Sequence, residues 1–257
     1  MTQDNITFGN NYTLYHDDFF RVSDSIRDSS IDLAIIDPPY NISSTAKTVY
    51  RPGEYTQTTV TEAWDTFNTD DFFQFNNNWI EQIEKKLNKS TGSAFVYGTH
   101  HNIYQVGFLL QQHNLRIINS IVWFKTNAPP NVSCRTLRDS VEHIIWFAPA
   151  TSKWTFNYDY ARSVSGKQMR NVWEFAKVAP REKKFGNHPT QKPEIITERL
   201  IKIASSKNDK ILIPFAGSGT EMKVAIENER TVIGVERDNE YVSWIKNRLS
   251  IPDSLKF

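Results

Sequence analysis

The stretch that decides the fold is Lys210-Ile-Leu-Ile-Pro-Phe-Ala-Gly-Ser-Gly-Thr220, in a chain of 257 residues. Its apolar run 210–213 is typical of a short, buried strand. Glycines at positions 217 and 219 allow the backbone to turn sharply into a helix, and another strand-like run follows at 230–235. A strand, a glycine-rich turn, a helix and a further strand in this order predict an α/β protein.

The same alternation runs through the rest of the chain. Strand-like runs also lie at residues 31–36, 93–97, 117–124 and 144–147. Apolar side chains recur at helical spacing at Trp79, Ile80, Ile83 and Leu87, at Ile196, Leu200 and Ile203 after Pro193, and at Val224 and Ile226. This pattern predicts a doubly wound, mostly parallel sheet with helices on both faces.

One segment departs from the alternation. Residues 133–187 are rich in Arg, Lys, Ser, Asn and aromatic side chains and show little periodicity. We therefore expect a small inserted lobe at 133–187 and one layered core built from 1–132 and 188–257. No internal repeat or low-complexity linker indicates separate modules, and 39% apolar residues suffice for a substantial core.

Composition excludes several classes of protein. No run approaches the about 20 apolar residues that cross a bilayer, and the polar first residues do not resemble a signal peptide, so we expect a cytoplasmic protein without a membrane partner. The single cysteine, Cys134, excludes an internal disulfide, and we expect it to be buried or inert. Because the net charge is only +1, a nucleic-acid face must come from local clustering of basic residues.

A first motif with chemical meaning, Asp37-Pro38-Pro39-Tyr40, directly follows the strand 31–36. Doubly wound sheets bind ligands at the carboxyl ends of their strands. Since proline has no N–H, this turn presents rigid carbonyls beside the Asp37 carboxylate. Two acceptors of this kind suit the methylation of an exocyclic amino group, because they draw its nitrogen toward tetrahedral geometry and free the lone pair for attack.

Tyr40 completes the motif with an aromatic ring. Such a ring stacks on a base that has been flipped out of a duplex, a contact that stabilises binding by about 1–3 kcal/mol. A strand-ending turn with a buried tyrosine is the plain alternative.

The glycine-rich turn 214–220 is a second motif. Alone it also fits an NAD-binding turn or an ordinary tight connection, although Met222 stands where the dinucleotide fingerprint has its third glycine, and the Gly-Lys-Ser/Thr of a P-loop is absent. Glu236 ends the next strand, at the distance where an acidic residue binds ribose hydroxyls. A nucleoside-containing cofactor is therefore indicated, with a solvated strand-end carboxylate as the alternative for Glu236.

With these residues the sequence resembles the permuted, or β, group of DNA amino-methyltransferases, in which the catalytic tetrapeptide precedes the cofactor motif. The likeness covers nearly the whole chain. Beyond the two motifs it is carried by His16-Asp-Asp-Phe19, Trp64-Asp65, Ile121-Val-Trp-Phe-Lys-Thr-Asn127 and, most specifically, His188-Pro-Thr-Gln-Lys-Pro193. His101-Asn-Ile-Tyr104, Pro130-Asn-Val-Ser-Cys-Arg135 and Gly166-Lys-Gln-Met169 are further similar to the small adenine methylases of GATC restriction–modification systems.

The resemblance implies an α/β methyltransferase sheet with an inserted target-recognition lobe, and site-specific methyl transfer from S-adenosylmethionine to adenine N6 in DNA. It also implies a restriction–modification setting with a cognate endonuclease as a partner, and a homodimer as one oligomeric state. Asp37 favours adenine, because cytosine-N4 members usually carry serine there. The implied catalytic residues are Asp37, Pro38, Pro39 and Tyr40. The implied cofactor-binding residues are Asp18, Asp37, His188, Thr190, Lys192, Phe215, Gly217, Ser218, Gly219, Thr220 and Glu236.

Two positions depart from the family pattern. Members commonly have Asp at the position of Ile213, and a second Thr at the position of Glu221. Both positions adjoin the cofactor motif, and the loss of a carboxylate near the cofactor's positive charges predicts weaker binding. Glu221 is a candidate to replace that carboxylate.

Positive charge gathers in the segment 133–187, which this group uses for target recognition. Lysine and arginine there can neutralise phosphates, and arginine can read guanine edges. The residues that we expect to bind DNA are Arg135, Arg138, Lys167, Arg170, Lys183 and Lys184. An ordinary solvated surface is the alternative. The polar segment 43–61 fits a DNA contact and a plain surface loop equally well.

Other functions stay open on the sequence alone. A cytosine-N4 methyltransferase is one, and a DNA-binding homologue with impaired catalysis is another, for which Ile213 and Glu221 are the hints. We expect no metal site, because the six histidines show no ligand spacing, at positions 16, 100, 101, 113, 143 and 188.

Overall fold

A computed structural model describes residues 5–42, 63–131 and 134–250 of the chain. The polar segment 43–61, considered above as a DNA contact, lies outside the described residues. Over the described ranges, no helix has both the length and the apolar character needed to span a membrane.

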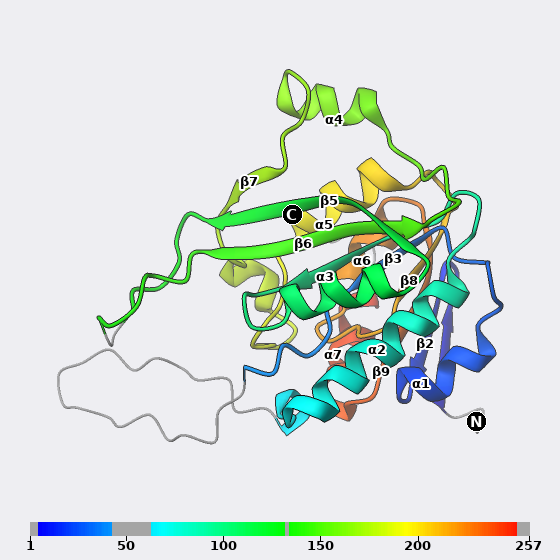
Figure 1. Cartoon of the computed structure of the whole chain (residues 1–257). Helices are drawn as coiled ribbons and strands as arrows, with labels where there is room; N and C mark the ends of the chain where they lie inside the picture. The colour runs from blue at the N-terminus through cyan, green and yellow to red at the C-terminus, as the bar shows by residue number, and fades with distance from the viewer. Residues whose placement is uncertain (1–4, 43–62, 132–133, 251–257) are drawn as a thin grey trace.

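Nine strands of the described chain form a single sheet (Figure 1). The strands are β1 (Ile6–Gly9), β2 (Tyr12–His16), β3 (Leu33–Ile36), β4 (Ser93–Gly98), β5 (Leu115–Lys125), β6 (Val141–Pro149), β7 (Val172–Phe175), β8 (Lys210–Ile213) and β9 (Thr231–Glu236). The helices are α1 (Phe19–Val22), α2 (Thr69–Lys86), α3 (Ile103–Gln112), α4 (Tyr158–Ser165), α5 (Glu194–Ala204), α6 (Thr220–Glu227) and α7 (Asn239–Leu249), with short 3-10 turns η2 (Ser23–Ser25), η3 (Ala63–Asp65) and η4 (Pro180–Lys183).

The strand order is β1-β2-β9-β8-β3-β4-β6-β5-β7, and the centre of the sheet is parallel. Strands β2, β9, β8, β3 and β4 run in one direction, whereas β1 and β6 are antiparallel to their neighbours. In β3, Leu33 pairs with Ile211 on one side and with Ser93 on the other. All four β3 residues are buried, as expected for a strand covered on both faces.

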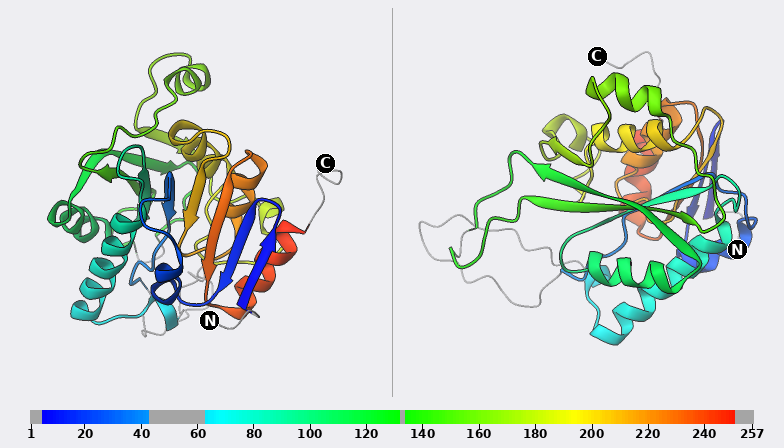
Figure 2. Two further views of the ribbon diagram at one scale, coloured as in Figure 1. Left: turned by 90° about the vertical axis from the view of Figure 1, so that its right-hand side faces the viewer. Right: turned by 45° about the horizontal axis from the view of Figure 1, so that its top comes forward.

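Helices cover both faces of this sheet, so the chain is a mixed α/β protein of the predicted doubly wound kind (Figures 1 and 2). Successive β3 side chains enter opposite cores. Leu33 and Ile35 belong to the core beneath α4, α5, α6 and α7. Ala34 and Ile36 belong to the core beneath α1, α2 and α3, which contains Trp79.

The predicted strands are present, with small differences at their ends. The run 210–213 coincides with β8, whereas β3 begins only at Leu33 because Ile31 forms an isolated bridge with Leu87. Three strands were not predicted. The hairpin of β1 and β2 is half-exposed at the sheet edge and mixes aromatic, apolar and polar residues without a clear alternation, and β7 is only four residues long within an aperiodic segment.

The segment 133–187 contributes to the sheet. Strand β6 lies between β4 and β5, and β7 pairs with β5 at the edge. Both strands therefore belong to the layered core, although the whole segment was expected to be an insertion. The connection between β5 and β6 carries Cys134, which is exposed, so the expectation of a buried cysteine is wrong.

Candidate active site

A cavity of about 630 Å³ lies at the carboxyl ends of the parallel strands and brings the two sequence motifs together. Asp37 enters it after β3, Pro214 after β8 and Glu236 from the end of β9. Because these strands are parallel and adjacent, segments far apart in sequence meet at one edge of the sheet.

The glycine-rich turn shapes one wall of the cavity. Gly217 and Gly219 have φ angles of 48° and 75°, in the left-handed region that favours glycine. A Cβ atom on Gly219 would lie 2.8 Å from Cγ1 of Ile245, so α7 can pack this closely only because residue 219 has no side chain. The N–H of Gly217 donates to Glu236 over 2.7 Å, which ties the turn to the end of β9.

Glu236 is held in a fixed orientation at the cavity wall. Its second carboxylate oxygen accepts the N–H of Asp238 over 2.9 Å. Burial raises the pKa of Glu236, whereas these backbone hydrogen bonds oppose the shift. A carboxylate that is fixed here can accept hydrogen bonds from ribose hydroxyls.

Four aromatic rings form an apolar wall of the cavity. Phe75 is the centre of this wall, with ring centroids 5.8 Å from Phe20, 5.1 Å from Phe67 and 5.9 Å from Phe215. All four side chains line the cavity. Flat apolar surfaces of this kind suit a purine ring.

His188 lies between two further aromatic rings. It stacks on Trp64 with centroids 6.1 Å apart and meets the edge of Tyr241 at 4.5 Å. Burial, together with the positive charge of Lys192, lowers the pKa of His188 to about 3. His188 is therefore neutral near pH 7, and it acts as a wall of the cavity rather than as a cation.

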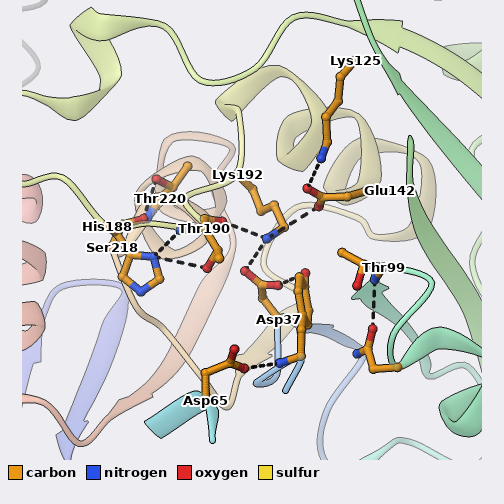
Figure 3. A network of polar contacts seen from close by, with 12 residues as sticks. Asp37, Asp65, Thr99, Lys125, Glu142, His188, Thr190, Lys192, Ser218 and Thr220 are labelled. Carbon is orange, nitrogen blue, oxygen red and sulfur yellow. Dashed lines mark hydrogen bonds and ion pairs between the residues drawn. The ribbon is translucent and has the colours of Figure 1, made fainter. Parts of the chain in front are cut away.

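The Asp37 carboxylate is bound by two donors (Figure 3). The Tyr40 hydroxyl donates to one oxygen. The Lys192 ammonium donates to the other oxygen over 2.7 Å. Burial raises the pKa of Asp37, and Lys192 acts against this shift. These two contacts hold the Asp37 carboxyl group at the cavity in a fixed orientation.

Asp65 fixes the turn that follows Asp37. Its carboxylate accepts the backbone N–H groups of Tyr40, Asn41 and Ile42 over 2.6, 2.8 and 2.8 Å. Only 1% of Asp65 is exposed, so these are buried, charge-assisted hydrogen bonds. The positive φ angle of Asn41, 57°, lets the three N–H groups converge on one carboxylate.

The two departures from the family pattern have different surroundings. Ile213 is 1% exposed, belongs to the hydrophobic core and does not line the cavity. Glu221 does line the cavity, although it is 5% exposed. Burial, together with the charge of Asp37, raises the pKa of Glu221 to about 7.

The structure brings most of the expected cofactor residues to the cavity. Those that line it are Asp18, Asp37, His188, Thr190, Lys192, Phe215, Gly217, Ser218 and Glu236. Gly219 and Thr220 do not line it: Gly219 is the N-cap of α6 and packs against Ile245, and Thr220 is buried with its hydroxyl 2.9 Å from that of Ser218. Of the catalytic motif, Asp37, Pro38 and Pro39 reach the cavity, whereas Tyr40 is 3% exposed and packs inside.

The expected DNA-binding residues come from separate segments. Arg135 and Arg138 lie in the connection between β5 and β6, Lys167 and Arg170 lie between α4 and β7, and Lys183 and Lys184 lie at η4. All are exposed except Lys183, which is half-buried. Several of these side chains have local contacts: the Lys183 ammonium donates to Asn187, the Lys184 ammonium lies over the Phe185 ring, and Arg138 Nε donates to the carbonyl of Pro129 over 3.1 Å.

Sequence reasoning missed Glu142 and Lys125, and it gave Asp65 no role. Glu142 is the second residue of β6 and Lys125 the last of β5, so the antiparallel pair places both at the cavity edge of the sheet. Their ammonium and carboxylate groups are 2.8 Å apart. Only the strand register could have revealed this pairing. Among the described residues, no group of three or more His, Cys, Asp or Glu is placed to hold a metal ion.

Fold and site together define an α/β group-transfer enzyme that holds a nucleoside-containing cofactor beside an oriented carboxylate. The comparison with protein families makes the class specific. A family model described as DNA methylase, for N6 and N4 methyltransferases, matches residues 31–247. The chain therefore belongs to this family, and it is a DNA methyltransferase.

Curated relatives match over nearly their whole length. The Type II methyltransferase M2.LlaDCHI of Lactococcus lactis subsp. cremoris is 37% identical, over 93% of this chain and 90% of the relative. M2.DpnII of Streptococcus pneumoniae is 36% identical with the same coverage. M2.MboI of Moraxella bovis is 38% identical, over 93% of this chain and 87% of the relative.

Solved structures share the fold. A complex of M1.HpyAVI with SAM aligns with a TM-score of 0.71 at 24% identity, covering 93% of this chain and all of that one. The cytosine-N4-specific PvuII DNA methyltransferase aligns with a TM-score of 0.76 at 16% identity, over 96% of this chain and 89% of that one.

Proposed function

We propose that this enzyme transfers a methyl group from S-adenosylmethionine to the N6 amino group of adenine at a specific DNA sequence. The observation that carries the proposal is Asp37, an oriented carboxylate at the edge of a cavity shaped for a nucleoside. The acceptor is adenine because an aspartate begins the Pro-Pro-Tyr turn. Relatives that are named Type II methyltransferases support a place in a restriction–modification system with a cognate endonuclease.

The cavity residues fit S-adenosylmethionine. The phenylalanine wall around Phe75 suits the adenine ring, and Glu236 suits the ribose hydroxyls. Glu221 and Asp37 supply negative charge for the ammonium and sulfonium groups. When bound, the cofactor supplies an electrophilic methyl group on sulfur.

Asp37 prepares the acceptor nitrogen. Its carboxylate accepts one N–H of the amino group, and a carbonyl of the Pro38-Pro39 turn accepts the other. Both contacts favour tetrahedral nitrogen and strengthen as positive charge develops on it, so they lower the barrier. Once the nitrogen has accepted the methyl group it carries one proton too many, and the Asp37 carboxylate would accept that proton and pass it to water.

DNA binding would use the exposed basic residues of the three segments that contain Arg135, Lys167 and Lys184. Their side chains can neutralise phosphates, whereas the target base must leave the stack to reach Asp37. The parts of 133–187 that lie outside β6 and β7 form the proposed target-recognition region.

The test is product analysis of DNA from cells that express the enzyme. We expect N6-methyladenine at one short sequence, and none with Asp37→Ala, which should still fold. N4-methylcytosine instead would move the enzyme to the other branch of its family. Absence of both products with a folded wild-type protein would favour a DNA-binding homologue that has lost catalysis.

A further inference from the structure

Lys192 is enclosed by groups that fix its ammonium. It is 2% exposed, and its Nζ donates to Asp37 over 2.7 Å and to the carbonyl of Thr190 over 2.8 Å. The rings of Tyr40 and Tyr97 flank it, with centroids 5.2 and 5.1 Å from Nζ. Each of these partners favours the charged form of the buried lysine.

A second carboxylate faces the same ammonium. Glu142 Oε2 lies 3.9 Å from Lys192 Nζ, is buried, and has no hydrogen-bond partner within the part of the chain that the structure describes. Its other oxygen pairs with Lys125 over 2.8 Å. Figure 3 shows the resulting row of alternating charges, from Lys125 through Glu142 and Lys192 to Asp37.

We propose that Lys192 is a positioning residue for the Asp37 carboxylate rather than a cofactor ligand, and that Glu142, anchored by Lys125, holds Lys192 in place. The inference rests on the proposed function, in which Asp37 must accept a hydrogen bond from the target amino group. In this proposal Lys192 orients Asp37, whereas the family resemblance implied that Lys192 binds the cofactor.

Donor geometry carries this assignment. An ammonium has three N–H donors, and two of them are already directed to Asp37 and Thr190, leaving one on the side of Glu142. A cofactor carboxylate that bound Lys192 would have to replace Asp37 or Thr190 as a partner, or take the third donor in competition with Glu142. The Asp37 bond is also the contact that sets the direction of the acceptor lone pairs.

Lys192 and Glu142 should shift the pKa of Asp37 in opposite directions, and these directions can be tested. An opposite charge within about 4–6 Å lowers the pKa of a carboxyl by about 1–3 units, and a like charge raises it. Burial raises the pKa of Asp37, Lys192 acts against that rise, and Glu142 adds to it. The ionisable groups that face Asp37 are Lys192, Glu142, Glu221, Tyr40 and Tyr97.

Single-turnover methylation across pH, at saturating S-adenosylmethionine, tests the proposal. Glu221→Gln serves as the background, because it removes the second acid that titrates near Asp37. The acid limb of the pH–rate profile is the fall in methylation rate at low pH. Lys192→Met should move this limb to a pH higher by about 1–3 units, since Asp37 loses its opposite charge. Glu142→Gln should move it down, because the isosteric amide can still face Lys192 while the negative charge that raises the pKa of Asp37 is gone. The affinity for S-adenosylmethionine, measured by calorimetry at a pH above the acid limb of each variant, should not weaken in either, because neither change removes a group that binds the cofactor.

The matched control is Lys202→Met on α5. Lys202 also pairs with a carboxylate, that of Glu198, and its ammonium lies over the ring of Tyr160, but it does not line the cavity. This variant should leave the acid limb in place. If Lys192→Met weakens cofactor binding and leaves the acid limb where it is, the proposal is overturned. It is also overturned if Lys192→Met changes neither the acid limb nor the cofactor affinity.

Two further outcomes are decisive. If Lys192→Met does not fold, Lys192→Gln carries the test: it also removes the positive charge beside Asp37, so the acid limb should again move up, and an unmoved limb there overturns the proposal. If the product is N4-methylcytosine, the proposed acceptor fails while this test still stands, because either amino group needs an oriented Asp37.

Discussion

At the scale of single residues, the hydroxyl of Tyr40 ties its ring to Asp37 and turns it away from the cavity. We expect Tyr40→Phe to lower the methylation rate by about 10- to 100-fold, because a buried hydrogen bond to a charged group contributes about 1.5–3 kcal/mol. Calorimetry should show unchanged cofactor affinity. Wild-type turnover in Tyr40→Phe would instead favour a ring that rotates out and stacks on the flipped base.

Glu221 should make cofactor binding depend on pH. Because its pKa is raised to about 7, it is largely neutral below that value and ionised above it. The cofactor's positive charge favours the ionised form, so affinity for S-adenosylmethionine should rise as the pH rises through about 7, with release of a proton. Glu221→Gln should remove this rise.

Calorimetry in two buffers of different ionisation enthalpy measures both the affinity and the proton release. The cofactor's own amino group titrates in both proteins, so the difference between wild type and Glu221→Gln reports Glu221 alone. If wild type and Glu221→Gln have the same pH profile of cofactor affinity, Glu221 does not replace the carboxylate that other family members have at position 213.

The sequence predicts which residues form the site better than it predicts which of them contact one another. Asp37, Glu236 and Gly217 were identifiable because each follows or ends an apolar strand, and the fold then places them in one cavity. The inward position of Tyr40 and the pairing of Lys125 with Glu142 depend on which side chains face each other across strands. A sequence does not contain that register until the sheet order is known.

At the scale of elements, the turn after β3 is rigid because one carboxylate binds three successive N–H groups. Asp65→Ala would leave these donors without their acceptor, and each such loss costs about 1–3 kcal/mol. We expect a lower free energy of unfolding and a methylation rate that falls further than stability alone explains. Asp65→Asn should be intermediate, since its amide retains one acceptor oxygen.

Asp209 supplies the control for this prediction. It accepts the N–H of Ser206 over 2.7 Å in the turn before β8, at the opposite edge of the sheet from the cavity. Asp209→Ala should lower the free energy of unfolding in denaturant titrations while leaving the methylation rate per folded enzyme unchanged. Equal losses of rate in the two variants would mean that Asp65 acts only through global stability.

The elements that could be predicted are those whose environment is uniform. Strands such as β3 and β8 are buried on both faces and therefore appear as continuous apolar runs. Strand β7 has a mixed burial pattern over four residues, which is too short for periodicity to show. Strand β6 was found as an apolar run, but the polar residues around it concealed that its segment belongs to the sheet.

At the scale of the whole molecule, a net charge of +1 gives little general attraction for DNA. Affinity must then depend on a few local cations near the cavity edge. Lys183 and Lys184 lie at η4. The guanidinium of Arg248 links η4 to the glycine-rich turn, because it donates to the carbonyl of Glu182 in η4 and to that of Ser218 in the turn. A phosphate held at η4 would thus be connected to the glycine-rich turn.

Replacing Lys183 and Lys184 with alanine should therefore weaken binding to all DNA sequences alike. It should also reduce the slope of log affinity against log salt by up to about 2, because each lysine that neutralises a phosphate adds about 1 to that slope. Arg135→Ala should instead weaken the cognate sequence more than others. The control is Lys207→Ala, an exposed lysine paired with Glu229 just before β8, away from the cavity. Fluorescence-anisotropy titrations of cognate and scrambled duplexes over a range of salt concentrations measure both effects. If the double variant keeps the wild-type slope, or if Lys207→Ala changes it equally, η4 does not bind the DNA backbone and the basic residues there belong to an ordinary solvated surface.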